Sequence, residues 1–107
     1  MAFVIRLLNA NVTNAGSQTV LYSCSSPNQG AIVNNIRFVN TGGSAATVNL
    51  FFKPSGGATH RILDKDKSVA AGDIFVVKSD LTMFTADQIE ATTSAAMDYV
   101  VSGMEKV

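Results

Sequence analysis

The chain has 107 residues, of which 47% are hydrophobic and only 15% are charged, and its formal net charge is zero. This length suits one domain with a single core, and the absence of a basic cluster disfavours nucleic-acid binding. The single cysteine, Cys24, excludes an intrachain disulfide and gives no indication of secretion or of a zinc site, and no apolar run reaches the roughly 18 residues of a membrane span.

The first predicted strand, Phe3–Leu8, is apolar on both faces except at Arg6. A loop rich in Asn, Gly and Ser, residues 9–18, separates it from a second strand, Thr19–Cys24. Residues 25–30 contain a proline and a glycine and favour a turn. The start of the chain has no basic segment before its apolar residues, so it does not resemble a signal peptide.

The central feature of the predicted fold is a hairpin. Its two apolar arms, Ala31–Val39 and Thr47–Lys53, flank a polar turn in which Gly42 and Gly43 are suited to positive φ. An isolated hairpin is marginal in water, so its apolar face requires a second layer. Alternation predicts this buried face from both arms: Ile32, Ile36, Phe38, Val48, Leu50 and Phe52.

Short apolar segments separated by turn residues continue to the end of the chain. The last of them, Met97–Glu105, predicts a strand because of its β-branched and aromatic run at Tyr99–Val101. A short helix from Thr93 to Met104, capped by Ser94, is the alternative. Before it, Thr59–Leu63 and Ile74–Lys78 are expected to be strands, and Leu81–Phe84 begins a further segment that continues after a turn as Gln88–Thr93.

This pattern of seven to eight short strands, with turns between them and no long helical period, predicts an all-β fold. We expect one antiparallel β-sandwich, of Ig-like or jelly-roll-like type, that spans residues 1–107 as a single domain. Residues 1–10 are expected to form a strand or arm that can reach another subunit.

No motif for catalysis, cofactor binding or metal binding is present. His60 is the only histidine, and because no Gly-x-Ser-x-Gly pattern supplies a nucleophile, we interpret it as an exposed strand residue. Asp64–Lys67 resembles a fragment of a calcium loop but lacks the glycine and the distal glutamate of such a loop, so we interpret it as a charged rim. The sequence therefore predicts a protein that is not an enzyme and uses no cofactor.

Two features break the sandwich pattern and indicate protein contacts. Phe51 lies between inward-facing positions and must face outward, where an aromatic ring can anchor a partner. Phe3–Leu8 has one charge and no proline, so it would be a hazardous free edge. Contacts with a neighbouring subunit through Phe3, Ile5 and Phe51 would cover both features, and burial of both within the same subunit is the alternative.

Several segments follow one another in a distinctive order: Tyr22, Ala31–Asn40, Thr47–Leu50, Pro54–Gly57, Ala71–Asp73, Ala86–Ala91 and Val101–Glu105. In this order the chain, from about Thr19 to Glu105, resembles a family of small β-sandwich bacteriophage virion structural proteins. Members of this kind decorate or cement capsids, or belong to the neck or tail. The resemblance implies a non-enzymatic component of the virion, assembled in the host cytoplasm.

Together, the residues and the resemblance predict a capsid decoration or cement subunit. Its expected partners are further copies of itself and other virion proteins such as the major capsid protein, with neither nucleic acid nor membrane. A neck or tail accessory role is one alternative. A soluble carbohydrate- or ligand-binding sandwich is an alternative of another class, which the lack of tryptophan and the presence of only Tyr22 and Tyr99 for sugar stacking disfavour.

Overall fold

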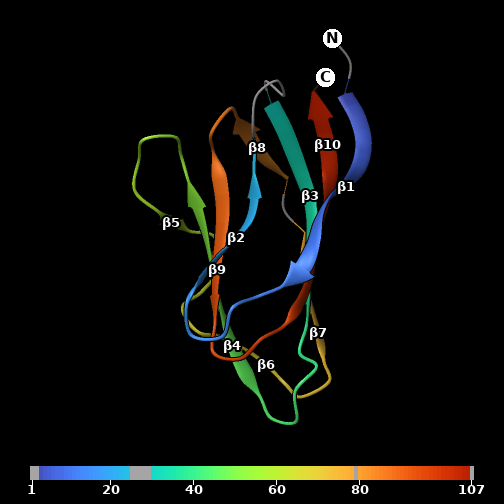
Figure 1. Cartoon of the computed structure of the whole chain (residues 1–107), viewed down its shortest axis with the longest axis vertical. Coiled ribbons are helices and arrows are strands. Elements are labelled where there is room, and N and C mark those ends of the chain that lie inside the picture. The colour runs from blue at the N-terminus through green and yellow to red at the C-terminus, as the bar shows by residue number, and fades with distance from the viewer. Residues whose placement is uncertain (1–2, 25–29, 79, 107) are drawn as a thin grey trace.

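The computed structural model describes residues 3–24, 30–78 and 80–106, and for Phe3, Ile5 and Arg6 it describes the main chain alone. Two five-stranded antiparallel sheets form a sandwich (Figure 1). Sheet A comprises β1 (Phe3–Val12), β10 (Asp98–Lys106), β3 (Gly30–Val39), β7 (Ile74–Val77) and β8 (Leu81–Phe84). Sheet B comprises β2 (Gln18–Ser23), β9 (Gln88–Thr93), β4 (Ala46–Lys53), β5 (His60–Arg61) and β6 (Lys67–Val69).

The predicted all-β antiparallel sandwich is confirmed, with ten strands in the described residues where seven to eight were expected. β6 is a strand where none was expected, and β5 is the two-residue strand that lies within the predicted Thr59–Leu63. β1 is longer than predicted and continues to Val12. The last segment is the strand β10, so the helical alternative from Thr93 to Met104 is wrong. No helix in the described part of the chain is a candidate membrane span.

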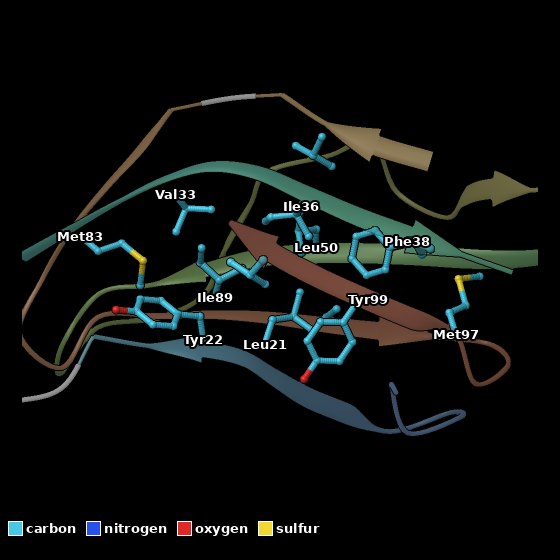
Figure 2. Packing of buried hydrophobic residues seen from close by; sticks show 14 of the residues in the cluster. Leu21, Tyr22, Val33, Ile36, Phe38, Leu50, Met83, Ile89, Met97 and Tyr99 are labelled. Atoms are coloured by element: carbon cyan, nitrogen blue, oxygen red, sulfur yellow. The ribbon is translucent and has the colours of Figure 1, made fainter. Parts of the chain in front are cut away.

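The core lies between the two sheets, because each strand directs alternate side chains inward. Figure 2 shows side chains from both sheets meeting in this layer. Burial of one Leu- or Phe-sized side chain stabilises the fold by about 1.5–3 kcal/mol, so this layer is its main source of stability. The largest fully buried side chains include Phe38, Leu21, Ile36, Leu50, Met83, Ile89 and Met97.

The predicted hairpin is wrong, because β3 belongs to sheet A and β4 to sheet B, and they do not pair. The segment between them crosses from one sheet to the other, and Asn40 at its start is fully buried. The Asn40 Nδ2 donates to the carbonyls of Ser44 (2.9 Å) and Val69 (3.0 Å), and its Oδ1 accepts from the N–H of Gly42 (3.1 Å). A buried polar hub therefore fixes this connection, and neither Gly42 nor Gly43 has positive φ.

A β-bulge corrects the predicted face of β3. Ser102 of β10 lies opposite Asn35 while Gly103 lies opposite Val33, so Asn34 is an extra residue. Because one extra residue reverses the alternation, Val33 is fully buried and Ile32, predicted to face the core, is only half-buried on the opposite face. The Asn34 side chain turns away and donates to Asp80 Oδ1 at 2.8 Å.

The other predicted inward positions are confirmed. Ile36 and Phe38 of β3 and Val48 and Leu50 of β4 are buried, and Phe52 packs against the core. Similar slips occur at Leu8 in β1 and at Leu21 in β2. Regular stretches therefore follow the sequence alternation, and each bulge reverses it.

Candidate interaction surfaces

The residues that the sequence offers for chemistry lie apart from one another. In residues 3–24, 30–78 and 80–106, no three His, Cys, Asp or Glu side chains are grouped as a metal site. His60 is exposed on β5, as interpreted from the sequence. Asp66 accepts from Asn49 Nδ2 at 2.9 Å and its N–H donates to Asn49 Oδ1 at 2.9 Å, so the charged rim is tied to β4.

A buried polar pair connects the two sheets near one end of the sandwich. The Tyr22 hydroxyl of β2 donates to Glu105 Oε2 of β10, and both residues are buried. Burial, reinforced by the bond to Glu105 and by its negative charge, raises the pKa of Tyr22. Burial and the carboxylates of Glu105 and Asp87 likewise raise the pKa of the Cys24 thiol. Tyr22 is therefore held protonated as a donor, and this pair acts as a cross-link between the sheets.

The outward side of sheet B carries Phe51, one of the three predicted interface residues. Phe51 does not belong to the core cluster, whereas Phe52 packs against it, so the predicted outward orientation holds. The ring is only half-exposed, because the Arg61 guanidinium lies over it with 4.9 Å between the guanidinium carbon and the ring centroid. Arg61 Nη1 also donates to Asn49 Oδ1 at 2.6 Å. A partner that used Phe51 would meet this cation and ring together.

Glu90, beside Phe51, is the unusual residue of this surface. It lies opposite Phe51 of β4 and opposite Val20 of β2, yet only 3% of its surface is exposed. Its Oε1 atom is buried and has no hydrogen-bond partner. A buried polar atom without a partner costs about 1–3 kcal/mol, and more when it is charged. Glu90 therefore destabilises the isolated subunit.

Replacing Glu90 with methionine is expected to raise the free energy of unfolding by roughly 1–2 kcal/mol, because the buried Oε1 without a partner is removed and an apolar chain of similar length remains. Urea denaturation of the purified protein measures this difference. Gln88→Met is the control, since Gln88 is half-buried on the same strand and lies on the same face; it should change the free energy by less than about 0.5 kcal/mol. A less stable Glu90→Met variant would contradict the assignment of Glu90 as an unpaired buried acceptor.

β1, the predicted intersubunit strand, lies at the edge of sheet A. It pairs only with β10 within the sheet, so its other side has no neighbouring strand. Asn9 fastens β1 to both sheets, because its Nδ2 donates to the Leu21 carbonyl (2.7 Å) and to the Tyr99 hydroxyl (3.1 Å). The side chains of Phe3 and Ile5 lie outside the described residues, so their predicted contacts remain a prediction. The predicted free edge is present in the subunit.

Exposed apolar side chains are concentrated on the outward face of sheet A, a feature that no pattern in the sequence predicted. Five large hydrophobic side chains are exposed in the described residues, and four come from strands of sheet A. Those four are Leu7 (60% exposed), Val12 (48%), Ile74 (52%) and Phe84 (67%), whereas Val20 of sheet B is the fifth. Half-buried Val100 and Met104 lie between them on β10. We call this surface the sheet A face.

Two shallow hollows shape the sheet A face. One, of about 320 Å³, is lined by Asn35, Arg37, Val100 and Ser102 over the middle of β3 and β10. The other, of about 150 Å³, lies at the edge formed by β8, where exposed Phe84 meets Gly30–Ile32, Thr82, Met83 and Lys106. The first hollow is lined mainly by polar side chains and the second mainly by apolar ones, so a partner protein could place both kinds of side chain on this face.

The signal for this face was present in the sequence but was divided among distant segments. Leu7, Ile74 and Phe84 each stand in a different short apolar run, and only the sheet order brings them to one surface. Phe51, in contrast, was found because its neighbours along β4 alternate regularly. The structure does not bring Phe51 together with the β1 edge, since the two belong to different sheets.

No family model matches the sequence, and no curated protein matches it. Several solved structures share the fold, among them structures from infectious bursal disease virus. They include the crystal structure of its T13 viral particle (TM-score 0.67, 10% identity), the structure of its Gx strain (TM-score 0.62, 13% identity) and its VP2 subviral particle (TM-score 0.61, 13% identity).

Each of these matches covers 97% of this chain but only 30–32% of the viral chain. The chain thus spans about a third of the length of the viral proteins that it resembles. At 10–13% identity the likeness concerns the fold alone. The structural neighbours are proteins of viral and subviral particles, so the fold of this chain is also found in viral particles.

Proposed function

We propose that this protein is a non-enzymatic structural component of a bacteriophage particle, a capsid decoration or cement subunit that binds the shell through the sheet A face. The observation that carries the proposal is the concentration of exposed apolar side chains on one sheet, four of the five in the described residues. Ile74 and Phe84 lie beside opposite ends of β3 and Leu7 lies on the other edge strand, so the face offers a partner several separate apolar anchors around a more polar centre. The capsid proteins that share the fold support the virion context.

The size of the face suits such a contact. β1, β10 and β3 have 9–10 residues each, so with β7 and β8 beside them they cover roughly 30 Å by 15–20 Å. When the surface buried on this subunit and the surface buried on its partner are added, the total is about 1,000 Å², the threshold that separates stable protein contacts from incidental ones. Many copies bound to one lattice also add their weak contacts through multivalency.

The mechanism is adhesive. A subunit whose sheet A face bridges two neighbouring shell proteins adds buried apolar area across the seam between them. The zero net charge of the chain removes long-range repulsion between subunits that must lie close together on the shell. The expected partners are accordingly the major capsid protein and further copies of this chain.

Co-sedimentation with particles assembled without this protein tests the proposal. Wild-type protein should sediment with the particles, and the double variant Ile74→Ser, Phe84→Ser should bind about tenfold more weakly or worse, because two exposed apolar contacts are lost. Val20→Ser is the matched control, since Val20 is an exposed apolar residue of the opposite sheet and its loss should leave binding unchanged. Denaturation midpoints check that all variants fold.

Absence of wild-type binding would overturn the proposal. Equal binding by the double variant and the wild type would exclude the sheet A face as the contact. Phe51→Ser belongs in the same series: unimpaired binding by that variant would show that the predicted Phe51 anchor is not used. Images of decorated particles distinguish a shell position from a neck or tail position.

A further inference from the structure

The edges of the two sheets differ greatly in length. The far edge of sheet A is divided between β7 and β8, with four residues each, and one edge of sheet B is divided between β5 and β6, with two and three. β2, the remaining edge of sheet B, has six residues, whereas β1 has ten. Short, charged edge strands resist pairing with other chains, and β5 and β6 contribute His60, Arg61 and Lys67. β1 is therefore the one long edge of the described sandwich.

The C-terminal half of β1 is closed by its own side chains. Asn9 Oδ1 accepts from the N–H of Ala10, and Asn11 Oδ1 accepts from the N–H of Val12, both at 2.9 Å. Because hydrogen bonds alternate along an antiparallel strand, these two N–H groups are directed away from β10. The two asparagines occupy donors that an incoming strand would need.

The N-terminal half of β1 has the opposite character. The register slip at Leu8 reverses the alternation, so the main-chain groups directed away from β10 in this half are those of Phe3, Ile5 and Leu7. Within the described residues, no side-chain oxygen occupies the N–H of Leu7. An open pairing edge thus runs along Phe3–Leu7, next to the exposed Leu7 side chain of the sheet A face.

This open edge is complementary to itself. An antiparallel pairing with a twofold axis at Ile5 places Phe3 opposite Leu7 of the other copy, so the three outward-directed residues meet and each pair exchanges two hydrogen bonds. Arg6, the single charged residue of β1, then lies opposite Val4 and not opposite the other Arg6. The pairs Phe3–Leu7 and Ile5–Ile5 join apolar residue types, and the two Arg6 residues are not opposite each other.

We propose that two copies of this chain associate through Phe3–Leu7 of β1, which joins their A sheets into one continuous sheet. The inference rests on the proposed function and deepens it by naming a second copy as the partner of the β1 edge, which lies beside the sheet A face. The pair would present two sheet A faces side by side and so double the apolar area offered to a shell.

Sedimentation velocity over a range of concentrations tests the pairing. Wild-type protein should form a dimer, and Ile5→Pro should be monomeric, because proline removes an N–H directed at the second copy while leaving the bonds to β10 in place. Ala10→Pro is the matched control: its N–H is already occupied by Asn9, so the variant should remain dimeric. Should Ile5→Pro fail to fold, Leu7→Lys, at an exposed position, should weaken the dimer by about tenfold or more.

Hydrogen exchange of the wild-type protein locates the contact. The amides of Ile5 and Leu7 should become more protected as the concentration rises, and that of Ala10 should not. A monomeric wild type, a dimeric Ile5→Pro variant, or a dimer without this protection would overturn the inference. The particle assay is separate: a dimer that does not bind particles overturns the proposed function alone, and a monomer that binds them overturns the pairing alone.

Discussion

Replacing Gly103 with alanine is expected to lower the free energy of unfolding by about 3 kcal/mol or more, a large part of the 5–15 kcal/mol that a domain of this size possesses. A Cβ at this position would lie 2.0 Å from the Ile32 carbonyl oxygen, and 3.0 Å from both the Ile32 carbonyl carbon and the Val33 Cα. All three are main-chain atoms, which cannot rotate away as a side chain can. The bulge that turns Val33 into the core therefore depends on glycine at this position.

Gly43→Ala is the matched control for this prediction. A Cβ on Gly43 would meet nothing within 4 Å, and its φ is not positive. We expect a change of less than about 0.5 kcal/mol, or a slight gain, because alanine restricts the unfolded chain. Denaturant titration of both variants measures the difference. A Gly103→Ala protein as stable as Gly43→Ala would show that β3 and β10 can shift apart without cost.

Replacing Asn40 with alanine is expected to lower the free energy of unfolding by roughly 2–4 kcal/mol. Three hydrogen bonds are lost, which leaves the carbonyls of Ser44 and Val69 and the N–H of Gly42 without this partner. The main chain of Asn40 also bonds to the turn before β7, through Asp73 (3.0 Å) and Gly72 (2.8 Å). Loss of the side chain should therefore loosen the crossover and that turn together.

Asn40→Asp separates the donor and acceptor roles of this side chain. Aspartate keeps the acceptor for Gly42 but loses both donors and directs a carboxylate at two carbonyl oxygens. It should be no more stable than the alanine variant at neutral pH, and it should gain stability as the pH falls and the carboxyl is protonated. Thr41→Ala, at the exposed next position, should be nearly neutral. An unchanged denaturation midpoint for Asn40→Ala would contradict the role of Asn40 as the hub of the crossover.

Regular alternation is the part of this fold that the sequence predicts well. Val48 and Leu50 on β4 were expected to face inward, and both are buried; Ile89, Ala91 and Thr93 on β9 follow the same period of two and are buried as well. β9 and the described part of β4 run without a bulge, so a period of two is sufficient.

The errors arise where one residue breaks that period or where pairing is nonlocal. The alternation of β3 looks the same with or without the extra residue at Asn34, which is accommodated only because Gly103 is its neighbour across the sheet. The connection between β3 and β4 poses the same difficulty. Two apolar strands joined by a polar segment are the sequence pattern both of a hairpin and of a crossover between sheets. Only the contacts of Asn40 with Val69 and Asp73, far along the chain, distinguish them.

The candidate surface was predictable in part. The long unprotected strand at the N-terminus and the outward position of Phe51 followed from composition and alternation. The position of Arg61 over the Phe51 ring could not be predicted in this way, because it depends on the pairing of β4 with the two-residue strand β5. The sheet A face did not follow from composition and alternation either, since its exposed residues come from three strands, β1, β7 and β8, that lie far apart in the sequence.

Phe3 at the start of β1 lies opposite Lys106 at the end of β10, so both ends of the described chain leave the sandwich at the same pole. A passenger domain or affinity tag fused to either end would therefore emerge beside the open half of β1. On a decorated shell, such fusions would compete for space with the neighbouring copy. An insertion at the opposite pole, in the exposed loop around Gly43, would carry cargo without this conflict.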